Sequence, residues 1–138
     1  MIFFTIVGIP VAKGRPKFFK RGAFMGTYTP EKTRDYADSV ISQALPYKPF
    51  RPIDSPIRVE LKFYFPVPQS APKKLKLMAD SEEVPVAKKP DLDNLVKAIL
   101  DPLNTVFWVD DKLIVALQAV KLFSDNPRTE VSIEVYAE

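Results

Sequence analysis

The sequence predicts one α+β domain over residues 1–138, with a mixed sheet of about four strands covered by two main helices. The length of 138 residues suits a single domain with one hydrophobic core. Apolar residues alternate with polar ones in some stretches, the period of a half-buried strand. In others they recur every three or four residues, the period of an amphipathic helix. No internal repeat or low-complexity tract interrupts this order.

The first third of the chain predicts a strand, an irregular segment and a helix. Residues 2–9 are β-branched and aromatic, and Pro10, which has no N–H to donate, ends that strand. Glycine and proline make residues 12–27 a loop or a short irregular hairpin. Thr29 is a plausible N-cap, with Pro30 as the first residue of a helix to about position 44. The core face of this helix carries Tyr36, Val40, Ile41 and Ala44.

Three further strands are predicted, one before the second helix and two after it. Residues 57–65 predict a strand, because Ile, Val, Leu and Phe alternate there with Arg, Glu, Lys and Tyr. Residues 66–89 are proline-rich and long for a connection within a compact domain, with a helical turn or more expected at residues 71–78. A strand from about residue 113 to 123 and a last strand at residues 129–136 complete the sheet.

The second helix is expected to begin with Asp91 as its N-cap. Its core stripe consists of Leu92, Leu95, Val96, Ile99 and Leu103. Asp93, Lys97 and Asp101 are spaced four residues apart, so they share one face of this helix.

Composition limits the chemistry. The chain has no histidine and no cysteine, which removes the commonest zinc ligands, the usual general base and any disulfide. Its reactive groups are therefore carboxylates, lysines and hydroxyls, with or without a hard metal ion. No apolar run reaches the ~20 residues of a membrane span, and the apolar start lacks the basic region of a signal peptide. We expect a soluble protein of the cytoplasm.

A basic, aromatic-rich segment precedes the first helix and continues into it. Its cations are Lys13, Arg15, Lys17, Lys20, Arg21, Lys32 and Arg34, and its aromatic residues are Phe18, Phe19, Phe24 and Tyr28. Such a segment can follow phosphates and stack on exposed bases, or it can be a solvated loop whose aromatic residues pack on the domain. The candidate DNA-binding residues are Lys13, Arg15, Lys17, Lys20, Arg21 and, before the acidic motif, Lys89.

The strongest candidate site is acidic. Asp91 and Asp93 lie at the expected helix start, and Asp110 and Asp111 precede the next strand. Mg²⁺ takes oxygen ligands, usually a few carboxylates together with water and substrate phosphate. If the chain returns beside the helix start, Asp91, Asp93 and Asp111 would hold such an ion, and Lys97 would contact the phosphate. This arrangement indicates a metal-dependent nuclease.

Each of these residues also has an ordinary structural interpretation. Asp91 would cap the helix, Lys97 would form surface ion pairs with neighbouring aspartates, and Asp110-Asp111 would form a turn. Phe107 and Trp108 are expected in the core rather than against a base.

Two stretches resemble the RusA family of Holliday junction resolvases. The first runs from Lys89 to Asp101 with the pattern Pro-Asp-x-Asp-Asn-x-x-Lys, followed downstream by Phe107-Trp108-Val109-Asp110-Asp111 and Val115. The second, Gly14-Arg15-Pro16 with Tyr28-Thr29-Pro30, Thr33 and Tyr36, is similar to members from Gram-positive bacteria and their prophages.

The resemblance implies a homodimeric endonuclease that uses Mg²⁺, with Mn²⁺ as a substitute, to cut four-way DNA junctions in recombination and repair. It places the essential aspartates at Asp91, Asp93 and Asp111 and the lysine at Lys97. The segment before the aspartate pair is slightly shorter here, so the choice between Asp110 and Asp111 stays open. The longer amino-terminal basic region leaves the preferred cleavage sequence open.

Two other functions fit parts of the sequence. One is a non-catalytic dimeric protein that binds branched DNA and uses its aspartates as caps and ion-pair partners. The other is a hydrolase of small phosphate esters, which the spread of basic residues disfavours because a small phosphate needs only a local clamp. Junction cleavage in Mg²⁺ that is lost in EDTA would separate an enzyme from a binding module.

Overall fold

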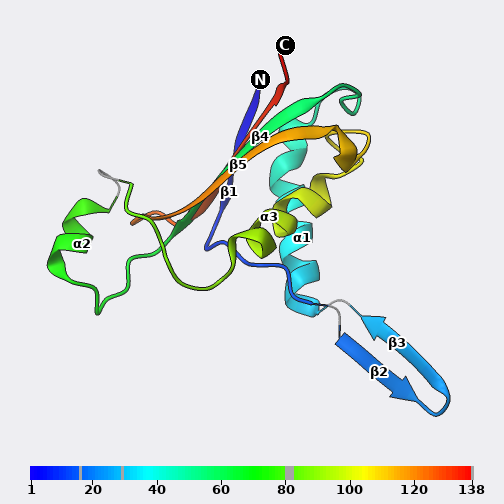
Figure 1. Ribbon diagram of the computed structural model, residues 1–138, viewed down its shortest axis with the longest axis horizontal. Helices are drawn as coiled ribbons and strands as arrows, with labels where there is room; N and C mark the ends of the chain where they lie inside the picture. The colour runs from blue at the N-terminus through cyan, green and yellow to red at the C-terminus, as the bar shows by residue number, and fades with distance from the viewer. Residues whose placement is uncertain (16, 29, 80–82, 138) are drawn as a thin grey trace.

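The chain is described by a computed structural model that covers residues 1–15, 17–28, 30–79 and 83–137 (Figure 1). Four strands form one mixed sheet in the order β1-β6-β4-β5. They are β1 (Ile2–Val7), β4 (Ile57–Phe65), β5 (Ile114–Phe123) and β6 (Arg128–Val135). β6 is antiparallel to β1 and to β4, whereas β4 and β5 are parallel. The predicted α+β class and the four-stranded sheet are confirmed.

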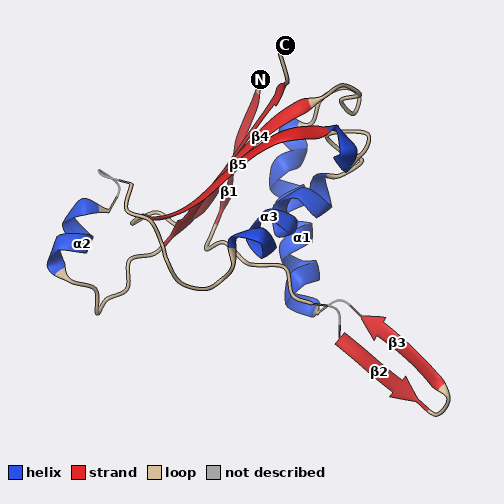
Figure 2. Cartoon of the chain, viewed as in Figure 1, coloured by secondary structure: helices blue, strands red, loops and turns tan. Residues whose placement is uncertain are grey.

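Two helices, α1 (Glu31–Ala44) and α3 (Leu92–Leu103), lie together on one face of this sheet (Figure 2). α1 packs on β1, and α3 packs on α1 and β5. Short 3₁₀ turns follow α1 (Leu45–Tyr47, η1) and precede β5 (Asp111–Leu113, η2). No helix in the described residues is both long and apolar enough to span a bilayer.

The alternating pattern of β4 explains why the core lies on the helix side of the sheet. Ile57, Val59, Leu61 and Phe63 are buried there, because residues two apart point to the same face of a strand. They meet Leu95 and Ile99 of α3 in one continuous core that also holds Phe107 and Trp108. Full burial of each such side chain stabilises the fold by about 1.5–3 kcal/mol.

Sequence periodicity predicts most elements well. The strand at residues 57–65 has the expected bounds, and the first helix begins one residue later than expected, with Pro30 in the N-cap position. The proposed N-cap Thr29 lies outside the described residues. Of the two alternatives for residues 12–27, the hairpin is correct: β2 (Lys17–Arg21) pairs with β3 (Phe24–Tyr28) and projects from the domain (Figure 1). The expected helical turn is α2 (Lys73–Met78).

The connection between β4 and β5 decides where the acidic residues lie. Because β4 and β5 are parallel, the chain must cross back between them, and α3 makes this return. Its first residues therefore lie near the end of β5, and its last residues lie near the beginning. Two contacts mark these ends: the Lys121 ammonium of β5 donates to the carbonyl of Pro90 at 2.9 Å, and Asn104 forms a β-bridge with Trp108.

Candidate functional site

The start of α3 carries two exposed carboxylates. Asp91 occupies the N-cap position, and its carbonyl accepts the amide of Leu95 at 3.2 Å, but its side chain makes no capping hydrogen bond. Asp93 lies in the first turn. Among the described residues, neither carboxylate has an ion-pair partner. The helix N-terminus stabilises both anions without neutralising them, so both remain available to a cation.

The segment before α3 is held in place by Lys121. This lysine belongs to β5, and its ammonium donates to the carbonyls of Lys88 at 2.6 Å and Pro90 at 2.9 Å. The amide of Val86 also donates to the Lys121 carbonyl at 3.0 Å. Lys121 was not among the predicted site residues. Its signal in the sequence is that it is the one charged residue within positions 113–123.

An open hollow of about 460 Å³ lies beside the helix start. It is lined by Lys89, Pro90, Asp91 and Asn94. Lys89, a predicted DNA contact, is exposed at its rim. A phosphate that entered this hollow would meet one cation, Lys89, and one carboxylate, Asp91. These two charges cancel, so binding of a phosphodiester here requires further positive charge.

A second groove of about 270 Å³ separates α1 from α3. Its lining includes Lys13, Arg34, Lys97 and Asp101. Lys97 therefore lies in a basic groove one turn from Asp93. Asp101 was expected to pair with Lys97, but its partner is Lys13. The ammonium of Lys13, a predicted DNA contact, is thus engaged within the protein.

The Gly14 region joins both helices at this groove. The Lys13 amide donates to the carbonyl of Asn94 at 3.0 Å, and the Gly14 amide donates to the Thr33 hydroxyl at 2.9 Å. A Cβ at Gly14 would lie 3.0 Å from that hydroxyl oxygen and 3.2 Å from Cγ of Pro30. A larger residue at position 14 would therefore push against both neighbours, and glycine favours this close approach between the acidic helix start and α1.

The two aspartates before β5 have different roles. The Asp110 carboxylate accepts the amide of Lys112 at 2.9 Å and caps η2, so its interpretation as a turn residue is supported. One oxygen of Asp111 accepts the indole N–H of Trp108 at 2.8 Å. Trp108 is fully buried, as expected for a core residue, and this hydrogen bond orients the exposed Asp111. The indole's role was not predicted, because a core assignment says nothing of its N–H.

One chain does not bring all the predicted metal ligands together. Asp91 and Asp93 lie at the beginning of α3, whereas Trp108 holds Asp111 beyond its end. Twelve helical residues span about 18 Å at 1.5 Å per residue. Within the described ranges no group of three or more acidic side chains could share an ion. The condition that the chain returns beside the helix start is not met.

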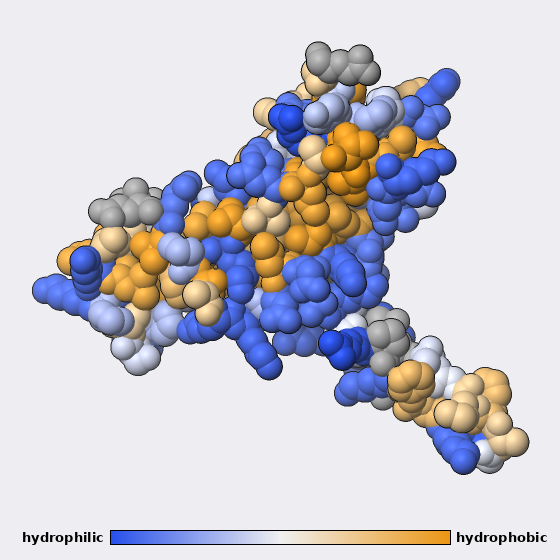
Figure 3. All heavy atoms as spheres, in the orientation of Figure 1, coloured by the Kyte–Doolittle hydropathy of each residue, from blue (hydrophilic) through white to orange (hydrophobic). Residues whose placement is uncertain are grey.

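The β2–β3 hairpin presents the remaining predicted DNA contacts. Lys17, Lys20 and Arg21 are exposed, and residues 17–28 contain no aspartate or glutamate. Phe18 is 79% exposed and Phe24 62% exposed. The space-filling view shows apolar side chains along this projecting arm (Figure 3). Arg15, before the hairpin, is exposed as well.

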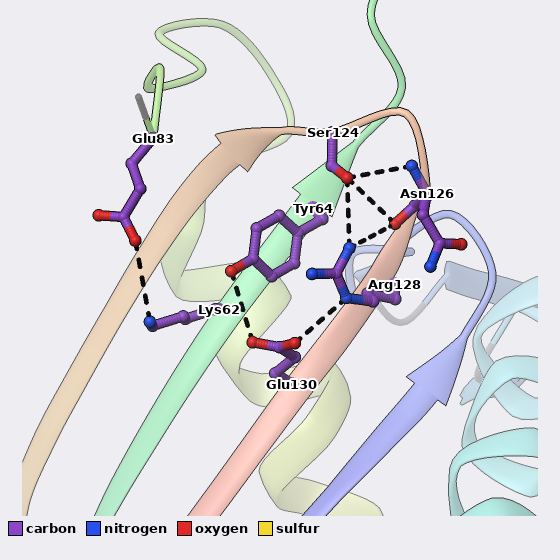
Figure 4. Close-up of polar contacts among 7 residues, drawn as sticks. All are labelled: Lys62, Tyr64, Glu83, Ser124, Asn126, Arg128 and Glu130. Atoms are coloured by element: carbon purple, nitrogen blue, oxygen red, sulfur yellow. Dashed lines mark hydrogen bonds and ion pairs between the residues drawn. The ribbon is translucent and has the colours of Figure 1, made fainter. Parts of the chain in front are cut away.

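The uncovered face of the sheet holds a polar cluster of a different kind (Figure 4). Arg128 pairs with Glu130 at 3.2 Å and lies 3.9 Å above the ring centre of Tyr64, while Lys62 lies 4.0 Å from Glu83. Burial raises the pKa of the Tyr64 hydroxyl, and the nearby Glu130 carboxylate adds to this rise. These four charges are paired with one another, unlike the carboxylates of Asp91 and Asp93 at the start of α3.

Comparisons with known proteins identify the family of this chain. The family model described as endodeoxyribonuclease RusA matches residues 8–134 of the chain. A relative from Bacillus subtilis (strain 168), named uncharacterized protein YqaN, is 36% identical over 134 residues, which cover 96% of this chain and 94% of the relative. The matched residues include the hairpin, both acidic groups and the basic groove.

Proposed function

Because the chain belongs to the RusA endodeoxyribonuclease family, we propose that it cuts four-way DNA junctions as a homodimer, with Asp91 and Asp93 at the phosphodiester that is hydrolysed. The observation that carries this proposal is the pair of exposed carboxylates at the start of α3 with no described partner. The Asp91 side chain makes no capping hydrogen bond, so capping does not account for this residue.

The carboxylates suit a hard divalent cation, Mg²⁺ or its substitute Mn²⁺. Such an ion is commonly held by one or two carboxylates, water and substrate phosphate, and Asp91 and Asp93 supply that number. When bound, it would neutralise the phosphate and lower the pKa of a bound water. Asp111, which the family resemblance implies, is proposed as a further ligand. Asp110 and Asp111 each accept one hydrogen bond through one carboxylate oxygen, so hydrogen bonding does not separate them.

Cations around the acidic residues supply the attraction for DNA. Lys97 would contact the phosphate from the groove between α1 and α3, and Lys89 from the rim of the hollow. Lys17, Lys20 and Arg21 on the hairpin would contact the backbone further out. Since two carboxylates repel phosphate, affinity must come from these cations and should fall steeply with salt.

A cleavage assay tests the proposal. A fixed four-way junction is incubated with the parent protein and with Asp93→Asn, each with Mg²⁺ and with EDTA. We expect paired nicks only for the parent in Mg²⁺. Linear duplex of the same sequence serves as the substrate control, and a model phosphate ester tests small-molecule hydrolysis.

Other outcomes of this assay would contradict the proposal in distinct ways. Binding of the junction without nicking in Mg²⁺ would indicate a non-catalytic branched-DNA-binding protein. Parental cleavage by Asp93→Asn would exclude the assigned carboxylate, and cleavage in EDTA would exclude the metal.

A further inference from the structure

The first half of the segment between α2 and α3 is anchored to the end of β5. The amide of Phe123 donates to the carbonyl of Val84 at 3.0 Å, and the amide of Val86 donates to the carbonyl of Lys121 at 3.0 Å. The side chain of Val86 is buried in a small apolar cluster that also holds Phe123. Backbone hydrogen bonds and apolar packing therefore hold this part of the segment.

The four residues that follow are held differently. Among the described residues, positions 87–90 have two hydrogen bonds to the rest of the chain, and both come from the ammonium of Lys121. Their acceptors are the carbonyls of Lys88 and Pro90. α3 follows directly, with Asp91 in the N-cap position. The connection between the anchored part of the segment and the acidic helix start therefore depends on one side chain.

These two hydrogen bonds act on both charged side chains of the open hollow. Because a peptide unit is planar, a fixed carbonyl also fixes the N–H and Cα of the next residue. The carbonyl of Lys88 therefore fixes the Cα of Lys89, and the carbonyl of Pro90 fixes that of Asp91. Lys89 and Asp91 are both exposed and both line the hollow. One ammonium thus orients a candidate phosphate contact and a candidate metal ligand.

Lys121 makes these contacts without neutralising the carboxylates. It forms no ion pair with any described residue. An ammonium paired with Asp91 or Asp93 would compete with a divalent cation for the same oxygens. An ammonium bound to the backbone leaves those oxygens free, and its hydrogen bonds are stronger than those of a neutral donor. Groups that orient metal ligands in this way control how tightly the metal is held.

We propose that Lys121 is a positioning residue of the nuclease site, which orients Asp91 for the metal ion and Lys89 for the phosphate. This inference rests on the proposed function. Loss of a group that orients a metal ligand typically lowers metal affinity or activity by about 10-fold to 100-fold. Lys121→Met should therefore raise the Mg²⁺ concentration for half-maximal junction nicking by about that factor. The rate at saturating Mg²⁺ should fall less, because excess metal compensates for the weaker site.

Two variants separate positioning from a general effect of charge. Lys121→Arg keeps a cation with several N–H donors and should recover part of the metal affinity that Lys121→Met loses. Lys62→Met is the matched control, because it removes an ammonium of β4 that pairs with Glu83 of the same segment at 4.0 Å. It should leave the Mg²⁺ requirement unchanged. Mn²⁺ binding without DNA, followed by electron paramagnetic resonance, should rank the variants in the same order.

The amide resonances of Lys89 and Asp91 in the metal-free protein give a readout independent of cleavage. Each N–H belongs to the same peptide unit as a carbonyl bound by Lys121, so both resonances should shift in Lys121→Met and not in Lys62→Met. Circular dichroism verifies folding, and Lys121→Gln replaces Lys121→Met if the latter is unfolded.

Three results would decide against one proposal or the other. Shifted resonances with an unchanged Mg²⁺ requirement would leave Lys121 a structural role and overturn the positioning role. An equal change of the Mg²⁺ requirement in Lys62→Met would overturn it as well. Failure of the parent to cut junctions would instead refute the proposed function, and the resonances would still show whether Lys121 holds the segment.

Discussion

The start of α3 and the β2–β3 hairpin carry side chains of opposite charge, and among the described residues neither the two aspartates nor the hairpin cations form ion pairs. The α3 start has Asp91 and Asp93 without described partners, whereas the hairpin has three exposed cations and no acidic residue. The uncovered face of the sheet differs from both, because six of its charges form three ion pairs with each other. The α3 start and the hairpin thus present charge of opposite sign.

This difference suggests that the acidic region takes part in the reaction and that the basic hairpin attracts the DNA. Carboxylates that would hold a cation at a scissile phosphate repel the same phosphate when no cation is bound. Cations that attract DNA contribute to affinity over a wide surface but need not touch the reacting atoms. If the two regions have these separate roles, substitutions at the start of α3 should change the rate of cleavage. Substitutions in the β2–β3 hairpin should change the affinity for DNA.

The largest effect is expected at the acidic region. Asp91→Asn should lower the single-turnover rate of junction nicking by at least about 100-fold, the loss typical when a charge-stabilising group is removed. Junction affinity should be equal or higher because a repulsive charge is lost. The free energy of unfolding in urea should change by less than about 0.5 kcal/mol, since Asn and Asp are similar N-caps.

A control on α1 separates this effect from a general loss of charge. Asp38→Asn removes one exposed carboxylate from α1 and should leave the nicking rate unchanged. If Asp91→Asn nicks junctions at the parental rate, or if it lowers the free energy of unfolding greatly, the role of Asp91 is structural.

The next effect is expected at the hairpin. The triple variant Lys17→Gln, Lys20→Gln and Arg21→Gln should reduce the slope of log affinity against log salt by about 3. Nicking at saturating protein should be unchanged. The matched triple is Lys73→Gln, Lys74→Gln and Lys76→Gln on α2, and an equal change there would show that the hairpin has no special role.

Local patterns predict the elements, but not which ends of them meet. The bounds of β4 follow from its alternation, and α3 follows from an apolar stripe with Asp91 at its start. The position of Asp111 depends on whether the chain returns to the beginning or the end of α3. That is decided by the parallel pairing of β4 with β5, which spacing along the sequence does not encode.

Two contacts of the site illustrate the same limit. Helical spacing predicts that Asp101 pairs with Lys97, yet its partner Lys13 is 88 residues away in the sequence. Lys121 secures the segment before Asp91 from another element. Such long-range polar contacts depend on the packed fold. The identity of the acidic and basic residues, by contrast, is visible in the sequence, because residue type and clustering are local properties.

The smallest effect in the comparison concerns the apolar part of the hairpin. Phe18→Ala should weaken junction binding by about fivefold to tenfold, the lower end of base–aromatic stacking, and should weaken duplex binding less because paired bases are already stacked. Fluorescence of 2-aminopurine at the branch point should report the lost contact. Phe50→Ala is the control, since Phe50 is 94% exposed but lies outside the hairpin. Equal losses for both variants, or for junction and duplex alike, would mean that the hairpin contributes charge alone.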